Sequence, residues 1–317
     1  MARLEMNDMP KKRVVIVNQN VTKYKAHPDA EVVYTNSSRE AAESLISLNP
    51  QIIELVGGDG TLSGTLNDVL IRDASFLSGK LIKITPRGSG NDRNKSLKEL
   101  DRAGKSNTYA GDISRAVGDS ARIITDDYLL ATINDTYQRY IFNVGGIGLD
   151  SQTLLEYEDL RRRKMPATFR YFEAASKAIL KLNGSVGKVD YDIPGIGLNS
   201  AEPVMFLFML GKYFGGGMPI NHKLNDNDGM FESVILRRGT NLKLFRSLIA
   251  ISMLQQPQYK NPLVSYLEPM NKVKLEVDNT DKFFFESDGE VLMENNKPVS
   301  VHKIEVSIAG KITYLLD

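Results

Sequence analysis

The stretch Glu54-Leu55-Val56-Gly57-Gly58-Asp59-Gly60-Thr61 decides the predicted fold, because it runs from a buried strand directly into a helix. Residues 51–56 (QIIELV) have the apolar run of a strand, and residues 61–70 have the pattern of a helix. Ligands of α/β sheets bind outside the carboxyl end of a strand. The glycines allow a ligand to approach the backbone closely, and the N-terminus of the following helix suits phosphate. The stretch therefore predicts a phosphate-binding loop in an α/β sheet.

The rest of the first half of the chain repeats this alternation of strands and helices. Strands are predicted at residues 13–17, 31–34 and 80–85, and Ser37 and Ser38 are N-cap candidates for the helix that follows them. Strands that alternate with helices are typical of a parallel sheet covered by helices.

Beyond residue 120 the pattern becomes rich in strands. Residues 122–133 and 137–144 are predicted strands that meet at the turn-like pair Asn134-Asp135. Further elements are helices at 149–163, 167–182 and 242–254, and strands at 188–193, 204–210, 230–236, 273–277, 282–286 and 302–308. Strands at this density predict an antiparallel sandwich or barrel.

Composition excludes several classes of protein. The chain has 317 residues, which favours two domains. Its net charge is +1, which argues against a nucleic-acid binder. The absence of cysteine excludes disulfides, thiolate zinc sites, iron–sulfur clusters and a cysteine nucleophile. No apolar run approaches the ~18 residues needed for a transmembrane segment, and the N-terminus lacks a signal-peptide pattern. We therefore expect a cytoplasmic protein.

Asp59 is unusual in a loop that is predicted to hold phosphate. A carboxylate repels phosphate unless a divalent cation lies between them, or unless it accepts the proton of an attacking hydroxyl. The alternative is that Asp59 only caps the helix that follows it. The loop matches neither the Walker pattern nor GxGxxG.

A second glycine loop, residues 86–92 (PRGSGND), follows the next predicted strand. Because the carboxyl ends of parallel strands lie at one edge of a sheet, both loops are expected to face the same crevice. Asn91 and Asp92 would there bind a substrate hydroxyl or reach a metal through water. A plain turn with an Asx cap is the alternative.

The two loops together, GGDGT and PxGSGND, resemble the catalytic domain of the diacylglycerol kinase family, which includes bacterial lipid kinases and sphingosine kinases. Further segments resemble the family in the same order along the chain: 142–150 (FNVGGIGLD), 211–218 (GKYFGGGM), 225–231 (NDNDGMF) and 288–290 (DGE). The ordered set extends from about residue 13 to residue 290, which makes it highly specific.

The resemblance implies an ATP-dependent lipid kinase with two domains. An α/β nucleotide-binding domain (11–125, joined by 309–317) would precede an antiparallel β-sandwich domain for the lipid (126–308), with the active site in the cleft between them. The implied nucleotide-binding residues are Asn18, Gly57, Gly58, Gly60, Thr61, Gly88, Ser89, Gly90, Asn91 and Asp92. The implied catalytic residues are Asp59, Asp288 and Glu290, and those of the Mg²⁺ site are Asp226, Asp228 and Met230. Asp59 and Asp288 both remain candidates for the general base.

Three departures from the family pattern leave the substrate and the catalytic rate open. Residues 18–23 (NQNVTK) keep the asparagine of the family's NPxSG-like loop but not its proline and glycine. Gly64 occupies a position that is usually glutamate, and residues 93–95 (RNK) replace the usual FAR. A soluble kinase similar to NAD kinase and a non-catalytic nucleotide or lipid sensor are therefore the alternatives.

Interactions with a lipid surface and with a second copy are also expected. The basic cluster 161–164 (RRRK), with Arg170, would dock the enzyme transiently on the inner face of the membrane. The alternative, which the neighbouring Glu156, Glu158 and Asp159 favour, is a solvated helix end with balanced charge. An exposed edge in the β-rich half would allow a homodimer. The pair Asp288-Gly289 between two apolar stretches predicts a hairpin turn.

Overall fold

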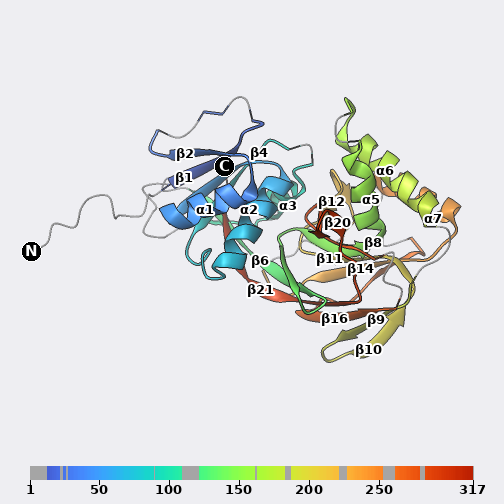
Figure 1. Cartoon of the computed structure of the whole chain (residues 1–317). Coiled ribbons are helices and arrows are strands. Elements are labelled where there is room, and N and C mark those ends of the chain that lie inside the picture. Colours follow the sequence, from blue (N-terminus) through green and yellow to red (C-terminus); the bar gives the residue numbers. More distant parts are fainter. Residues whose placement is uncertain are drawn as a thin grey trace, which may run out of the picture.

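The computed structural model describes residues 13–21, 24–25, 28–88, 90–108, 121–160, 163–182, 187–220, 227–252, 261–278 and 283–316. The described chain forms an α/β half and a β-rich half that lie side by side (Figure 1). None of the described helices is both long and apolar enough to cross a membrane.

The first half is built on parallel strands in the order β2-β1-β3-β4. Its elements are β1 (Arg13–Asn18), β2 (Glu31–Thr35), α1 (Ser38–Leu48), β3 (Ile52–Gly57), α2 (Asp59–Arg72), β4 (Leu81–Pro86), α3 (Asp92–Arg102) and the short β5 (Asn107–Thr108). Ser37 caps α1, because its side chain accepts a hydrogen bond from the backbone N–H of Glu40. The predicted parallel arrangement and the Ser37 cap are confirmed.

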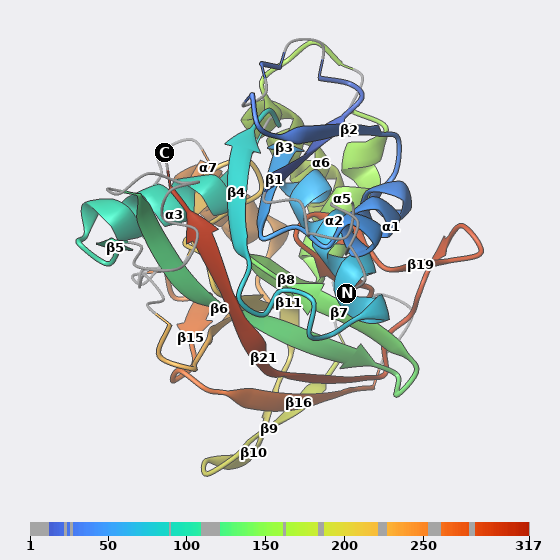
Figure 2. The same ribbon diagram turned by 90° about the vertical axis from the view of Figure 1, so that its left-hand side faces the viewer.

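Two long strands continue this sheet into the second half of the molecule (Figure 2). They are β6 (Arg122–Ile133) and β21 (Lys303–Leu315), which pair antiparallel over almost their whole length. The last residues of β21 also pair parallel with β4, and its first residues pair with β16 (Lys272–Val277). The predicted domain boundary at residues 125 and 126 therefore falls inside a strand of a continuous sheet, and the strand predicted at 302–308 extends to Leu315.

The β-rich half consists of two packed layers of strands. The large sheet ends in β9 (Val189–Ile193) and β10 (Gly197–Ala201), and also holds β7 (Tyr137–Ile141). The second sheet has the order β15-β14-β11-β8-β17-β18. Its strands are β15 (Val264–Tyr266), β14 (Glu232–Arg237), β11 (Pro203–Met209), β8 (Val144–Gly148), β17 (Phe285–Ser287) and β18 (Glu290–Val291). Buried side chains of both sheets, among them Leu129, Phe206 and Val273, form one apolar core.

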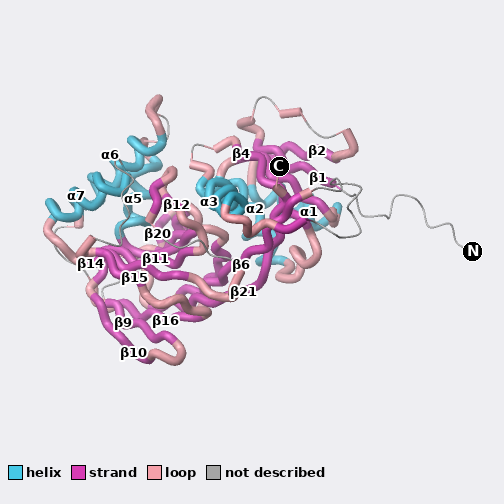
Figure 3. The backbone as a smooth tube through the Cα atoms, turned by 180° about the vertical axis from the view of Figure 1, so that it is seen from behind, coloured by secondary structure: helices cyan, strands magenta, loops and turns pink. Residues whose placement is uncertain are grey.

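Three helices cover the other face of the second sheet (Figure 3). They are α5 (Leu149–Glu158), α6 (Ala167–Lys181) and α7 (Asn241–Ser252). The remaining strands form two small hairpins, β12 (Tyr213–Phe214) with β13 (Met218–Pro219), and β19 (Met293–Glu294) with β20 (Lys297–Pro298). Gly146 allows β11 to approach its neighbouring strand β8 closely, since a Cβ at this position would lie only 2.5 Å from the carbonyl oxygen of Phe206.

Candidate active site

A cavity of about 480 Å³ is lined by residues of both halves of the molecule. From the first half, the lining consists of Asn18, residues 35–38, residues 58–63, Thr65, Gly88, Gly90, Asp92 and Arg93. From the second half, it consists of residues 142–144, Asp150, Leu154, Tyr157, Glu158, Tyr171, residues 214–216, Glu286 and residues 288–290. Both glycine loops thus reach one cavity, as their positions after neighbouring strands predict.

The two glycine loops are in direct backbone contact. Arg87 donates its backbone N–H to the carbonyl oxygen of Gly57 at 2.6 Å. A Cβ on Gly88 would lie 2.4 Å from the Cα of Gly58, so neither glycine has room for a side chain without a backbone shift. Asn18 donates its amide to the hydroxyl of Thr61 at 3.4 Å, which connects the end of β1 to the first loop.

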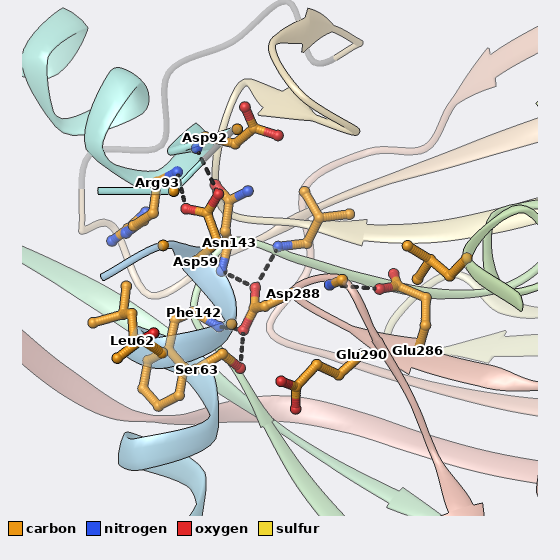
Figure 4. Close-up of a pocket in the computed structure, with 18 of the residues that line it drawn as sticks. Asp59, Leu62, Ser63, Asp92, Arg93, Phe142, Asn143, Glu286, Asp288 and Glu290 are labelled. Atoms are coloured by element: carbon orange, nitrogen blue, oxygen red, sulfur yellow. Dashed lines mark hydrogen bonds between the residues drawn. The ribbon is translucent and has the colours of Figure 1, made fainter. Parts of the chain in front are cut away.

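Asp59 caps a helix, but not the helix that follows it. Gly58 is the N-cap of α2. The Asp59 carboxylate instead accepts the backbone N–H groups of Asp92 at 3.0 Å and of Arg93 at 3.2 Å, at the N-terminus of α3 (Figure 4). The alternative that Asp59 caps its own helix is therefore wrong. Its carboxylate holds the two glycine loops together while it faces the cavity.

Asp288 lies in the predicted hairpin turn between β17 and β18, which is confirmed. Its φ is 51°, in the left-handed region that a turn of this kind requires. One carboxylate oxygen accepts the backbone N–H groups of Asn143 and Val144, and the other accepts the N–H of Phe142 and the hydroxyl of Ser63. Burial raises the pKa of Asp288 to about 6, although these hydrogen bonds act to lower it. Asp288 thereby connects α2 to the β-rich half (Figure 4).

Glu290 reaches from β18 toward the first turns of α2. A Cβ on Gly60 would lie 3.2 Å from its Oε1, and a Cβ on Gly64 would lie 3.9 Å from the same atom. Gly64 also faces α1, since its Cβ would lie 3.2 Å from the Cβ of Ser38. The glycine at position 64 thus allows both α1 and Glu290 to approach α2 closely.

Comparison of the chain with known proteins identifies its fold. No protein-family model and no curated protein matches the chain. Among solved structures, "a putative diacylglycerol kinase from Bacillus anthracis str. Sterne" superposes with a TM-score of 0.61 at 18% identity, and covers 97% of each chain. A second structure of the same description has a TM-score of 0.62 at 17% identity with the same coverage. The chain has the diacylglycerol kinase fold. The resemblance read from the motifs is thus confirmed for the fold.

The diacylglycerol kinase fold brings most of the predicted site residues to the cavity. Those that line it are Asn18, Gly58, Asp59, Gly60, Thr61, Gly88, Gly90, Asp92, Asp288 and Glu290. Gly57 lies beneath the side chain of Thr61, and Asn91 binds the backbone of Gly88 through its amide group; neither is among the described residues that line the cavity. Ser89 and Asp226 lie outside the described residues.

The predicted magnesium segment lies against β6 and does not contribute described residues to the cavity wall. Gly229 donates its N–H to Asp127 Oδ2 at 2.9 Å, and Lys311 approaches the carbonyl oxygen of Asn227 at 3.5 Å. Asp127 is fully buried, and its Oδ1 and the Oδ1 of Asn227 have no hydrogen-bond donor. Buried carboxylate and amide oxygens without donors fit a hard cation. The described residues contain no cluster of three or more histidine and acidic side chains with metal-binding geometry.

Arg93 accounts for one departure from the family pattern. It is 1% exposed and forms an ion pair of 2.7 Å with the equally buried Asp126, while its guanidinium stacks on the ring of Tyr314 at 4.8 Å. A phenylalanine, which the family pattern has here, would leave Asp126 as an uncompensated buried charge. Arg93, Asp126 and Tyr314 therefore form a set whose members depend on one another.

Among the cavity residues that sequence reasoning did not identify are the buried polar residues Asp150, Tyr171 and Glu286. Asp150 ends the FNVGGIGLD segment and Glu286 lies two residues before Asp288, but no charge pattern along the sequence connects them. A detectable signal was the position of Glu286, a carboxylate in an otherwise apolar strand, which predicts an unusual environment.

The stability of the protein is expected to depend on the ionisation of Asp92. Asp92 is 6% exposed, and its burial, followed by the charge of Asp59, raises its pKa to about 6 from an ordinary 3.8. Because the folded-state pKa is the higher one, ionisation costs stability as the pH rises from about 4 to about 6. The Asp92→Asn variant lacks this cost. Its free energy of unfolding relative to the wild type is therefore expected to increase over this range, by up to ~3 kcal/mol.

Urea denaturation of both proteins at a series of pH values measures this difference. Asp288 also has a raised pKa, but it is present in both proteins, so its contribution cancels. Parallel stability profiles of the variant and the wild type would contradict the assigned environment of Asp92.

Restoring the family's glutamate at position 64 is expected to destabilise this chain. The Gly64→Glu side chain would meet Ser38 and place a second carboxylate beside Glu290. We expect a loss of ~1–3 kcal/mol in the free energy of unfolding, as is typical of overpacking. Gly64→Ala is the matched control, because its higher helix propensity, worth ~1 kcal/mol, offsets the added methyl group. Equal stability of the two variants in urea denaturation would refute the close packing of α1 and Glu290 on Gly64.

Proposed function

We propose that this chain is an ATP-dependent kinase that transfers the γ-phosphate of ATP to the hydroxyl group of diacylglycerol or a similar lipid. One observation carries the proposal. Two glycine loops, each leading into a helix N-terminus, converge on a cavity that Asp288 and Glu290 enter from the other half of the molecule. The free backbone N–H groups at such helix N-termini can donate hydrogen bonds to phosphate oxygens.

Phosphoryl transfer requires mainly positioning and charge neutralisation. The first loop and Gly88 would hold the phosphates, since the absence of side chains at Gly58 and Gly88 leaves the backbone accessible from the cavity. The lipid hydroxyl would enter from the side of the β-rich half. Mg²⁺ bound with ATP would supply the positive charge that the acidic lining lacks.

The hydrogen bonds of the two candidate bases favour Asp59 as the group that takes the hydroxyl proton. Each oxygen of Asp288 already accepts two hydrogen bonds, which use both of its lone pairs. Each oxygen of Asp59 accepts one, so a lone pair of each is available to a substrate. Asp288 then acts as a positioning residue that holds α2 against the β-rich half.

A separate Mg²⁺ with a structural role is proposed at the segment that packs on β6. Asp127 and Asp228, with the carbonyl oxygen of Met230 and the carboxylate of Asp226, would hold it. The unpartnered oxygens of Asp127 and Asn227 support this assignment.

The lipid is proposed to be reached at the inner face of the membrane, with the cytoplasm as the location of the protein. Of the basic cluster, Arg161 and Arg162 lie outside the described residues, and Arg163 pairs with Glu173 at 2.9 Å. Replacement of residues 161–164 by glutamine is expected to weaken binding to anionic vesicles, and unchanged binding would remove the cluster from this proposal.

Incubation with labelled ATP and Mg²⁺ tests the function. Diacylglycerol micelles, sphingosine and NAD⁺ are offered in turn as acceptors, and ATP binding is titrated separately. Labelled lipid is the expected product. Phosphorylation of NAD⁺ alone would assign a soluble kinase, and ATP binding without any product would assign a nucleotide sensor.

A further inference from the structure

Two backbone N–H groups at the start of α3 determine how the Asp59 carboxylate lies in the cavity. They belong to Asp92 and Arg93, and each binds a different oxygen of Asp59. Within the described part of the chain, no other group forms a hydrogen bond with this carboxylate. The carboxylate therefore keeps one orientation only if the first turn of α3 is itself held in place.

The first turn of α3 has little apolar packing of its own. The first large apolar side chain that the helix buries is Leu97, five residues after its start at Asp92. The N-cap Asn91 binds the backbone of Gly88 through its side chain and does not cap the helix. The first turn must therefore be held by polar side chains.

Arg93 connects this turn to the large sheet. Its side chain is 1% exposed and is one of the largest fully buried side chains of the protein. Nη2 donates to Asp126 Oδ2 at 2.7 Å, and Nε donates to the hydroxyl of Tyr314 at 3.3 Å. These partners lie on β6 and β21, the two strands that pair along almost their whole length. The start of α3 is thus bound to an extended pair of strands.

Asp92 extends to the other side of the helix. Its Oδ2 accepts the N–H of Gly216 at 2.9 Å, and both residues line the cavity. Figure 4 shows the guanidinium group of Arg93 directed away from the Asp59 carboxylate, although the backbone N–H of the same residue binds it. The helix N-terminus is therefore held from two sides, and Arg93 supplies the connection on the side of the sheet.

A buried ion pair is a poor source of stability, because the loss of hydration of two charges offsets most of their attraction. Apolar side chains of similar volume often stabilise a protein equally well. Arg93 Nη1 is also buried without an acceptor, which adds to the cost. What the guanidinium group does provide is geometry, since its donors form a rigid planar fork. The arrangement of Arg93 and Asp126 thus favours a role in positioning over a role in stability.

We propose that Arg93 is a positioning residue for the general base: by binding Asp126 and Tyr314, it fixes the backbone N–H groups that orient the Asp59 carboxylate. Arg93 does not itself touch the reacting atoms. The inference rests on the proposed kinase function, and on Asp59 as the group that accepts the hydroxyl proton.

A double replacement removes the ion pair without leaving a buried charge. Arg93→Met with Asp126→Asn keeps similar volumes and retains an oxygen that accepts the N–H of Asp127, as Asp126 Oδ1 does at 2.8 Å. We expect kcat to fall by about 10–100-fold, the usual effect of a misplaced catalytic group. The KM for ATP is expected to stay unchanged, since Arg93 does not belong to the glycine loops that hold the phosphates.

The control removes a second ion pair between the same helix and the same strand. Arg122 on β6 binds Asp101 near the end of α3 at 2.8 Å. Arg122→Met with Asp101→Asn is therefore expected to leave kcat unchanged. Urea denaturation monitors the folding of every variant. Should the Arg93 double variant fail to fold, Arg93→Lys replaces it, because one ammonium group lacks the fork that binds Asp126 and Tyr314 together; a smaller loss of kcat is then expected.

The Asp59→Asn background distinguishes positioning from general loosening of the fold. If Arg93 acts through Asp59, its double replacement has no further effect on the residual kcat once Asp59 is gone. An equal fold-loss in both backgrounds would overturn the proposal. So would a normal kcat in the folded double variant, or a loss of the same size in the Arg122 control.

Hydrogen exchange at the amides of residues 92 and 93 provides a measurement that does not require turnover. We expect these amides to exchange at least about tenfold faster in the Arg93 double variant, since a hydrogen bond to a charged group contributes at least that factor. Asp59→Asn is the reference for the loss of the bonds themselves. Unchanged exchange would overturn the proposal. Faster exchange in a protein that phosphorylates no acceptor would refute the kinase function and still support the structural connection from Arg93 to Asp59.

Discussion

Replacement of Asp59 by asparagine is expected to lower kcat by about 10²–10⁴-fold, the usual contribution of a general base. An amide is no longer a base at neutral pH, but it still has one oxygen to accept a backbone N–H of α3. The other hydrogen bond at the N-terminus of α3 is lost, because the amide nitrogen faces the N–H of Asp92 or Arg93. The expected loss of stability is therefore only about 1 kcal/mol, as for the removal of a helix cap.

Initial rates with labelled ATP, together with urea denaturation, separate these two effects. Asp190→Asn, on strand β9 between β10 and β16, is the control for the substitution itself, because Asp190 does not line the cavity. If Asp59→Asn keeps a normal kcat, Asp59 does not accept the proton and the acidic lining has another use.

Replacement of Asp288 by alanine is expected to have the largest effect on stability. It removes the acceptor of three backbone N–H groups and of the Ser63 hydroxyl. Each unsatisfied group costs ~1–3 kcal/mol, and water from the cavity can reach some of them. We expect a total loss of ~3–5 kcal/mol in the free energy of unfolding, measured by urea denaturation.

Part of any such loss comes from the left-handed backbone at this position, which alanine tolerates poorly. Asp135→Ala measures that part, because Asp135 has a φ of 56° in an exposed turn, close to the 51° of Asp288. A loss at Asp288 no greater than that at Asp135 would show that the four hydrogen bonds do not hold the two halves together.

Local patterns predicted most of the fold because each depends on neighbouring residues. Apolar runs located β1, β3 and β11, and a turn-forming pair located the bend between β6 and β7. Helix α3 escaped prediction because it buries only two large apolar side chains, Leu97 and Leu100. Its N-terminus is stabilised instead by Asp59, 33 residues away in the chain, and no periodicity within α3 encodes that contact.

The motifs predicted that several acidic residues would lie close together, but not the contacts that hold them there. The motifs identified Asp59, Asp92 and Asp288 as residues of one site, and the structure brings all three to one cavity. The roles of Asp59 as a cap of α3 and of Asp288 as a junction depend on backbone groups in other elements, which carry no signature in the sequence.

The path of β21 has a consequence for how this protein is made. The C-terminal part of the strand is inserted between β4 and β6, and these two partners lie more than half the chain earlier in the sequence. Until residues 303–315 have left the ribosome, β4 and β6 of the growing polypeptide therefore lack the strand that pairs with them. Contacts between residues so distant along the chain also form slowly. A nascent chain that stops before this point would present two open strand edges, which invites capture by chaperones or association with its neighbours on the same polysome.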